Sequence, residues 1–225
     1  TYLRGMIRLI IADNSQIVQT GLHSIFSNYE NIEIIGDASS SESLYNLLVS
    51  FEADILLMDF GAEYANYASD LTRTIPVNGK FSNRQKAVYS SVLHVMKEAT
   101  NMLRPGTMFK EYNAEIGSIM ENELIGLGLL DKHDVQKQDP KNPLFKRYFM
   151  HGTSHYLGLD VHDVGSMDWP MQEGMVFTCE PGIYILEEEL GVRLENDILV
   201  TANGPDDLMK NIPIEIEEIE GLMNN

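Results

Sequence analysis

The chain changes its residue pattern within one apolar segment, DILLMDF at residues 54–60. Before this segment, short apolar runs alternate with helical patterns, whereas after it acids and histidines recur beside the apolar runs. A continuous apolar run that ends in an acid is typical of a buried parallel strand. The pattern therefore places Asp59 at the end of a strand, where two different chemistries are open to it.

The first part of the chain has the pattern of a doubly wound sheet. The runs IRLIIAD and NIEIIGD are separated by a helical pattern, and a second helical pattern leads to DILLMDF. This order predicts a βαβαβ unit with parallel strands. We expect an α/β fold in which residues 1–58 form this half-domain and residues 59–225 form an α+β second part.

The second part mixes long helices with short strands. YASDLTRTIPV predicts a strand with Asp70, Thr72 and Thr74 on one face. Amphipathic patterns predict helices over 82–103 and 109–128, and the first of them begins with a Ser-x-x-Gln capping box at residues 82–85. A polar loop is expected from about residue 131 to 147. After it, MVFTCEPGIYI and GVRLENDILVT are the clearest strands, and the acidic tail predicts a terminal helix or a solvated end.

The bulk composition excludes several classes of partner. The net charge is −18, with 34 acids against 16 bases, so the chain would repel a nucleic-acid backbone. No apolar run approaches the roughly 18–20 residues that cross a bilayer, so we expect no membrane partner. The single cysteine, Cys179, permits no internal disulfide, and the N-terminus lacks the pattern of a secretory signal. We therefore expect a cytoplasmic location.

Five side chains in the second part suit a pair of divalent metal ions. Hard metals prefer carboxylates and borderline metals also accept imidazole. Taken singly, each candidate reads as an ordinary turn or loop residue. Taken together, four acids beside apolar strands are costly to bury without a cation. The candidate ligands are Asp59, Asp70, His155, Glu180 and Glu195.

Four blocks of the second part resemble a known family. They are DFGAEYANYASDLTRTIPVNGKFS, FMHGTSHYLGLDVHDVG, GMVFTCEPGIYI and GVRLENDILVT. They are similar to the proline-specific peptidases of the pita-bread fold, in particular aminopeptidase P (Xaa-Pro aminopeptidase). The resemblance runs from Asp59 to about Met223. It implies a partial pita-bread fold and a metalloaminopeptidase that hydrolyses the bond between an N-terminal residue and proline, with a water molecule that two metal ions activate.

The resemblance also implies a role for each residue of the site. It makes Asp59, Asp70, His155, Glu180 and Glu195 the metal ligands, with Glu180 also acting as the general base. His151 and His162 match histidines that contact the substrate and stabilise the intermediate, and Arg193 matches an arginine that steadies a neighbouring ligand. Manganese is the family's usual metal, with cobalt or zinc as substitutes. The implied partner is a proline-containing peptide, and a homo-oligomer is left open.

A second resemblance competes for Asp59. The segment from MIRLIIADN to DILLMDF resembles the first half of a response-regulator receiver domain, in which Asp59 would be the phosphoacceptor and Asp13 would belong to an acidic pocket. That alternative is a signalling or interaction module without enzyme activity. The Ser/Thr-tipped and Lys-tipped strands that complete a receiver do not follow Phe60. We therefore favour the metal interpretation and expect a chimera of half a receiver and the metal-binding part of an aminopeptidase P.

The receiver-like half stands where the peptidase family has further catalytic structure. That region of the family carries a substrate-binding histidine shortly before the first aspartate, and this chain has no histidine between His23 and Asp59. We therefore expect slower turnover than in an intact family member.

Overall fold

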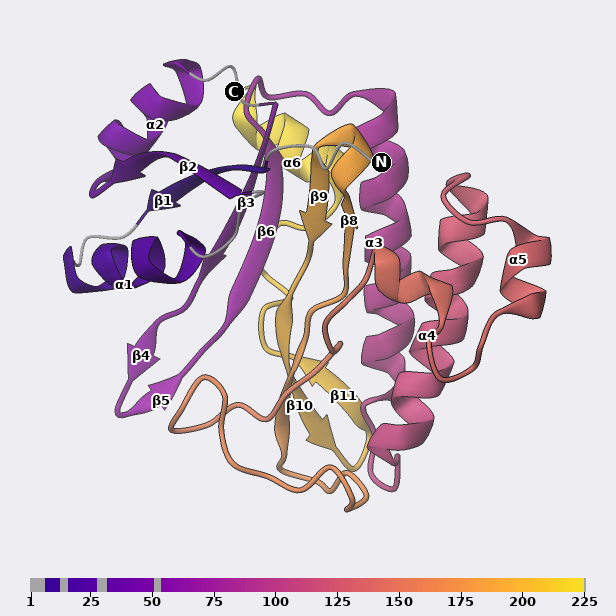
Figure 1. Ribbon diagram of the computed structural model, residues 1–225. Helices are drawn as coiled ribbons and strands as arrows, with labels where there is room; N and C mark the ends of the chain where they lie inside the picture. Colours follow the sequence, from indigo (N-terminus) through magenta and orange to yellow (C-terminus); the bar gives the residue numbers. More distant parts are fainter. Residues whose placement is uncertain (1–6, 13–15, 28–31, 51–53, 225) are drawn as a thin grey trace. The chain divides into compact units, whose positions relative to one another are not determined.

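The computed structural model describes residues 7–12, 16–27, 32–50 and 54–224 (Figure 1). The chain divides into two compact units, one of residues 1–56 with 185–190 and one of residues 57–184 with 191–225. The first elements in chain order are β1 Ile7–Ala12, α1 Gln16–Phe26, β2 Ile32–Ala38, α2 Ser41–Ser50, β3 Ile55–Phe60, β4 Glu63–Tyr64, β5 Tyr67–Ala68 and β6 Leu71–Pro76. The later elements are α3 Asn83–Met102, α4 Phe109–Gly126, α5 Lys132–Lys137, η1 Leu144–Arg147, β7 Val176–Cys179, β8 Gly182–Ile185, η2 Leu186–Glu188, β9 Leu190–Arg193, β10 Asn196–Thr201, β11 Gly204–Asp207 and α6 Ile216–Met223.

The first unit begins as its pattern predicts. β1 and β2 pair in parallel, with α1 between them in the chain, and α2 follows β2. Ile11 on β1 and Ala38 on β2 are buried, and Leu48 of α2 is buried as well. Parallel strands need apolar cover, which explains why both strands are rich in isoleucine. The four predicted elements before residue 51 are therefore confirmed as a βαβα order.

The third predicted strand pairs differently from the expectation. β3 forms as a strand, but among the described residues it is hydrogen-bonded to β6, while β1 and β2 form a separate two-stranded sheet. The expectation that β3 completes a βαβαβ sheet is therefore wrong for the described residues. The physical reason is local, because β3 leads through a tight hairpin to β6, and pairing across a short connection costs little chain entropy.

That hairpin joins two of the predicted ligands. The turn lies at Ala65 and Asn66, which have left-handed φ angles of 51° and 69°. β4 and β5 pair antiparallel on either side of this turn. At the base, a Cβ on Gly61 would lie 1.9 Å from the carbonyl oxygen of Ser69, so only glycine fits there. The glycine thereby lets the strand that carries Asp59 close against the segment that carries Asp70.

Two long helices supply much of the core of the second unit. The capping box predicted for α3 is present, with the Ser82 side chain accepting from the Gln85 amide and the Gln85 side chain accepting from the Ser82 amide. The predicted helix over 109–128 is α4. The fully buried side chains on α3 and α4 recur at helical spacing, as in Val88, Val92, Val95 and Ala99. Each buried valine contributes about 1.5–3 kcal/mol.

Two details of the second unit differ from the predicted elements. The expected polar loop contains a short helix, α5, because Asp131 accepts hydrogen bonds from the amides of His133 and Asp134. The predicted strand GVRLENDILVT is two strands, β9 and β10, which break at Leu194 and Glu195. The acidic tail forms a helix, α6.

The sheets of the second unit bring distant segments together. β10 lies between β11 and β7, with Asn196 opposite Cys179 and Asp197 opposite Thr178. β8 pairs with β9, and α3 contacts β7 and β11 (Figure 1). As a result, the end of β7 and the break between β9 and β10 meet near the start of β6, where the predicted ligands are concentrated.

Candidate metal centre

Three separate segments present acidic or imidazole groups to one place. Asp70 immediately precedes β6, and the break between β9 and β10 carries Glu195, whose amide donates to the Thr72 carbonyl at 3.1 Å. The loop that carries His155 runs along β7, since the Thr178 amide donates to the His155 carbonyl and the Glu180 amide to the Thr153 carbonyl. These backbone pairings fix the relative positions of the four side chains.

The side chains converge within coordination range. One donor atom from each of Asp70, His155 and Glu195 lies within 4.8 Å of the other two. Nε2 of His155 is 3.6 Å from Oδ2 of Asp70 and 3.5 Å from Oε1 of Glu180. The side chains of Asp70, His155 and Glu180 are 13%, 14% and 16% exposed, and Glu195 is 1% exposed. The structure thus brings four of the five predicted ligands around one buried focus.

Two oxygens in this region are buried without a partner. Oε1 of Glu195 and Oδ1 of Asp197 make no hydrogen bond within the described part of the chain. Their partner oxygens are engaged, because the Thr72 hydroxyl donates to Glu195 Oε2 at 2.6 Å and the Asp70 amide donates to Asp197 Oδ2 at 3.1 Å. A buried carboxylate oxygen without a donor or cation is energetically costly. A divalent cation held by Glu195 together with Asp70 and His155 would supply the partner that this Glu195 oxygen lacks among the described residues.

The ionisation of the cluster reflects its crowding. Burial raises the pKa of Glu195 to about 8, helped by the carboxylates of Glu180 and Asp70. Burial likewise raises the pKa of Asp197 to about 7, again with help from Asp70. Burial alone would lower the pKa of His155, but the nearby carboxylates of Asp70 and Glu180 raise it to about 9. Without a metal, the cluster therefore holds protons where a cation would otherwise balance the charge.

Asp59 occupies a more open position. Its side chain is 52% exposed and forms an ion pair with Arg193, which is itself 19% exposed. Burial and the neighbouring Asp70 raise the pKa of Asp59, against the lowering effect of Arg193. Its described partners are thus Arg193 and Asp70, and Asp13, the other residue of the phosphoacceptor interpretation, lies outside the described residues.

The predicted histidines differ in their relation to the cluster. The His162 ring stacks on the His155 ring with centroids 3.9 Å apart, so His162 lies directly beside the candidate ligands. The described contacts of His151 are with Gly152, the Tyr184 hydroxyl at 2.9 Å and the Phe149 ring. Burial lowers the pKa of His151. His162 therefore contacts a candidate ligand directly, whereas His151 is held by the aromatic residues around it.

The sequence interpretation passed over three polar residues of the centre. Thr72 bonds to Glu195, Thr178 donates to Glu180 Oε1 at 3.4 Å, and Asp197 holds the Asp70 amide. The alternation of Asp70 and Thr72 on one strand face was visible, but a threonine in a strand is usually only a good strand former. Cys179, next to Glu180, is buried and its thiol pKa is raised to about 12 by burial, so it stays protonated.

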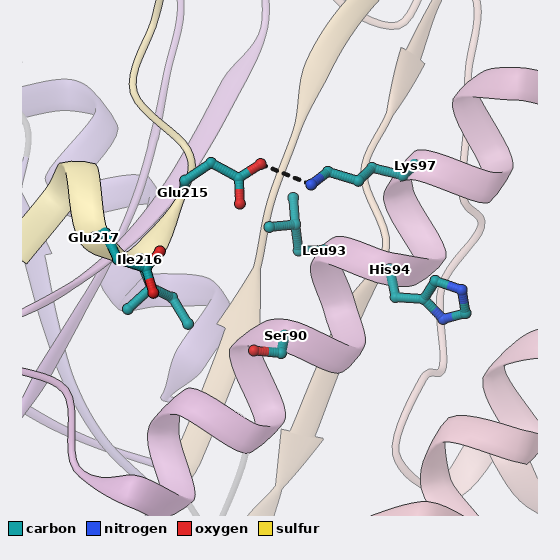
Figure 2. Close-up of a pocket in the computed structure, with 7 residues that line it drawn as sticks. All are labelled: Ser90, Leu93, His94, Lys97, Glu215, Ile216 and Glu217. Carbon is teal, nitrogen blue, oxygen red and sulfur yellow. Dashed lines mark hydrogen bonds and ion pairs between the residues drawn. The ribbon is translucent and has the colours of Figure 1, made fainter.

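A separate surface pocket has a different character (Figure 2). Its lining residues are Ser90, Leu93, His94, Lys97, Glu215, Ile216 and Glu217. The pocket lies between α3 and the start of α6, where Lys97 pairs with Glu215 at 2.6 Å. Both partners are about half exposed, and such surface pairs contribute at most about 1 kcal/mol. None of the predicted ligands lines this pocket, so the acidic cluster remains the candidate site.

Comparisons with known proteins point to the same part of the chain. The family described as "Metallopeptidase family M24" matches residues 15–202. The Xaa-Pro aminopeptidase of Haemophilus influenzae is 44% identical over 185 residues, covering 77% of this chain and 43% of that protein. That of Escherichia coli is 41% identical over 184 residues, covering 76% of this chain and 41% of that protein. The chain thus spans less than half the length of these relatives.

Solved structures agree with the sequence relatives. A zinc-substituted E. coli aminopeptidase P in complex with product superposes with a TM-score of 0.69 and 40% identity, covering 76% of this chain and 41% of that one. Proline aminopeptidase P II from Yersinia pestis gives a TM-score of 0.69 and 39% identity, covering 76% of this chain and 42% of that one. The mixed α/β fold is therefore similar to aminopeptidase P structures.

The receiver-like interpretation of the first part gains no support from these comparisons. The M24 match begins at residue 15 and so includes much of the segment assigned to a receiver.

Among the described residues, no helix has the length and apolar character needed to cross a bilayer.

Proposed function

The chain belongs to metallopeptidase family M24, and from this premise we propose that it is the metal-binding part of an exopeptidase of the aminopeptidase P type. The proposed reaction is hydrolysis of the bond between an N-terminal residue and a following proline. One observation carries the proposal: donor atoms of Asp70, His155 and Glu195 lie within 4.8 Å of one another, and one buried oxygen of Glu195 has no hydrogen-bond partner among the described residues. The Xaa-Pro aminopeptidases among its relatives support the substrate class.

We assign the metal-holding role to Asp59, Asp70, His155, Glu180 and Glu195. Four carboxylates and one imidazole suit two divalent ions of the manganese type, with cobalt or zinc as substitutes. A relative's structure is described as zinc-substituted, which supports zinc as a substitute in that protein. Two bound divalent ions lower the pKa of a water molecule and polarise the carbonyl of the scissile bond. Manganese in this chain is a proposal.

Glu180 has the surroundings of a general base. Its carboxylate is largely buried, and burial raises its pKa, while His155 and Arg193 lower it. The Thr178 hydroxyl, 3.4 Å from Oε1, orients the group. In the proposed reaction Glu180 accepts a proton from the attacking water and delivers it to the leaving nitrogen of proline. General-base catalysis of this kind contributes about 10²–10⁴-fold.

The remaining polar groups are assigned to the substrate or to a metal ligand. His162, which stacks on His155, and His151, which is anchored by Tyr184, are proposed to hold the substrate carbonyl and its developing charge. Arg193 is proposed to hold Asp59 in place through their ion pair. The slow turnover expected from the sequence stays a prediction.

Hydrolysis of Xaa-Pro dipeptides by metal-free protein, before and after addition of Mn²⁺, tests this proposal. We expect release of proline only with the metal, and its loss in Glu180→Ala by at least about 10²-fold. Glu173→Ala is the matched control, because Glu173 is an exposed glutamate of the same unit. Metal-dependent turnover that survives Glu180→Ala would show that the site has been misassigned.

A further inference from the structure

We propose that Thr72 is a positioning residue of the metal centre, whose hydroxyl holds one oxygen of Glu195 and leaves the other for the metal. This inference rests on the metal binding proposed above. Thr72 lies on β6, one position beyond the strand's first residue and two beyond Asp70.

The direction of the hydrogen bonds around Thr72 follows from their chemistry. Nε of Arg193 lies 3.0 Å from the Thr72 hydroxyl oxygen, and a guanidinium only donates. The hydroxyl oxygen therefore accepts from Arg193. Its own proton is then free for Glu195 Oε2, 2.6 Å away, which accepts it. The order of donation runs from Arg193 through Thr72 to Glu195.

The surroundings keep this arrangement in place. Thr72 is completely buried and Glu195 is 1% exposed, so water does not compete for either group. The Thr72 carbonyl also accepts from the Glu195 amide at 3.1 Å. Thr72 thus holds Glu195 at both its backbone and its side chain.

The consequence concerns the free oxygen of Glu195. A carboxylate has two equivalent oxygens, and rotation exchanges them unless a hydrogen bond distinguishes one. Here Oε2 is held by Thr72, while Oε1 is buried and has no hydrogen-bond partner among the described residues, and Glu195 belongs to one group of candidate ligands with Asp70 and His155. Removal of the hydroxyl would free the carboxylate to rotate and would leave Arg193 Nε without its acceptor. Partners that orient a metal ligand typically contribute 10–100-fold to metal affinity.

Thr74 provides a matched control on the same strand. It is also completely buried, and its hydroxyl donates to the Arg193 carbonyl at 2.9 Å and accepts from the Arg193 amide at 3.2 Å. Thr74 therefore bonds to the backbone of the residue whose side chain bonds to Thr72. It makes no described hydrogen bond to a carboxylate. Thr72→Val and Thr74→Val both remove one buried hydroxyl from β6, but only the first loosens Glu195.

Mn²⁺ titration of the metal-free variants tests the inference, with circular dichroism and thermal unfolding as checks of folding. We expect Thr72→Val to bind Mn²⁺ about 10–100-fold more weakly, Thr72→Ser to regain most of the affinity, and Thr74→Val to bind like the wild type. All three variants should unfold somewhat earlier than the wild type, so stability alone does not separate them.

Three results would overturn the inference while leaving the proposed function intact. They are wild-type affinity in Thr72→Val, an equal loss in Thr74→Val, and a failure of Thr72→Ser to recover affinity when it is folded. If the wild-type chain binds no Mn²⁺, both the inference and the proposed function fail. The wild-type titration therefore distinguishes the two cases.

Discussion

Each unit of the molecule pairs a histidine with an aspartate. In the first unit, Nε2 of His23 lies 2.8 Å from Asp37, and the two side chains are 43% and 40% exposed. In the second unit, Nε2 of His155 lies 3.6 Å from Asp70, and the side chains are 14% and 13% exposed. The shorter contact is the less informative one, because both of its partners are well hydrated and salt-screened.

The difference lies in the neighbours of each pair. His155 and Asp70 share their surroundings with Glu180 and with Glu195, and one buried oxygen of Glu195 has no partner in the part of the chain that the structure describes. The described polar contacts of His23 end at Asp37. A metal site is therefore better recognised from converging buried donors that lack partners than from any single close pair. The following predictions test this contrast, beginning with the largest expected effect.

The first prediction concerns Glu195→Gln, which replaces a buried carboxylate oxygen by an amide of the same shape. We expect Mn²⁺ affinity to fall by more than the roughly 10–100-fold typical of residues that only orient a ligand, and hydrolysis to disappear. Without metal, Glu195→Gln should unfold near the wild-type temperature at pH 7. The reason is that Glu195 of the metal-free wild type, with a pKa of about 8, is mostly protonated and therefore uncharged at this pH. Isothermal titration and thermal unfolding measure the two effects, with Glu173→Gln as control. Unchanged affinity in Glu195→Gln would remove Glu195 from the site.

The second prediction concerns pH. The pKa of Glu195 is raised from 4.5 to about 8, and that of His155 from 6.5 to about 9. Both groups bind protons more tightly in the folded state, so their stabilisation is present at low pH and is lost as pH rises through these ranges. The unfolding temperature of the metal-free protein should therefore fall between about pH 5 and pH 9.

Saturating Mn²⁺ should reverse that fall, because metal binding replaces the protons. In Glu195→Gln, the unfolding temperature of the metal-free protein should vary less with pH below about pH 8. This variant separates the effect of Glu195 from the general charge repulsion within a chain of net charge −18, because that repulsion is present in both proteins. Unfolding temperatures measured across this range, with and without Mn²⁺, provide the test. A metal-free profile that rises with pH would contradict the assignment.

The third prediction concerns Arg193→Lys. Arg193 reaches Thr72 with Nε and Asp59 with a terminal nitrogen, whereas lysine has a single nitrogen and cannot hold both. We expect Mn²⁺ affinity to fall by roughly tenfold, at the lower end of the range for residues that orient ligands. Mn²⁺ titration of the metal-free variant measures this loss. An affinity equal to the wild type would show that the contacts of Arg193 with Thr72 and Asp59 do not contribute to metal binding.

The smallest effect is expected in the first unit. His23→Ala removes an exposed pair that contributes at most about 1 kcal/mol to the free energy of unfolding. Mn²⁺ affinity should be unchanged. Urea unfolding and the titration measure the two quantities, and a loss of metal affinity in this variant would break the contrast between the two pairs.

Sequence patterns captured features that depend on near neighbours. The capping box of α3 and the apolar spacing of both long helices are local signals, and the elements formed as expected. α5 was missed because its start depends on the Asp131 cap and its residues have no apolar stripe. The partner of β3 was missed because apolar runs identify strands but do not choose between neighbours.

In the candidate site too, the sequence identified some residues and missed others. The four acids and the histidine stand in local contexts that resemble a family, so they were named as ligands from the sequence. The groups that hold them were not, because their partners are remote in the chain. Thr72 and Glu195 are separated by 123 positions, and Asp70 and Asp197 by 127. The break between β9 and β10, which allows Glu195 to face Thr72, was likewise invisible in an uninterrupted strand pattern.

The central claim is that Asp70, His155 and Glu195 form the core of a divalent metal site. It is tested most directly by counting the Mn²⁺ ions that metal-free wild-type protein binds, with free Mn²⁺ followed by electron paramagnetic resonance, beside His155→Ala. We expect stoichiometric binding, two ions per chain when the full proposed ligand set is engaged, and the loss of tight binding in His155→Ala. Absence of stoichiometric binding to the folded wild-type chain, or equal binding by His155→Ala, would contradict it.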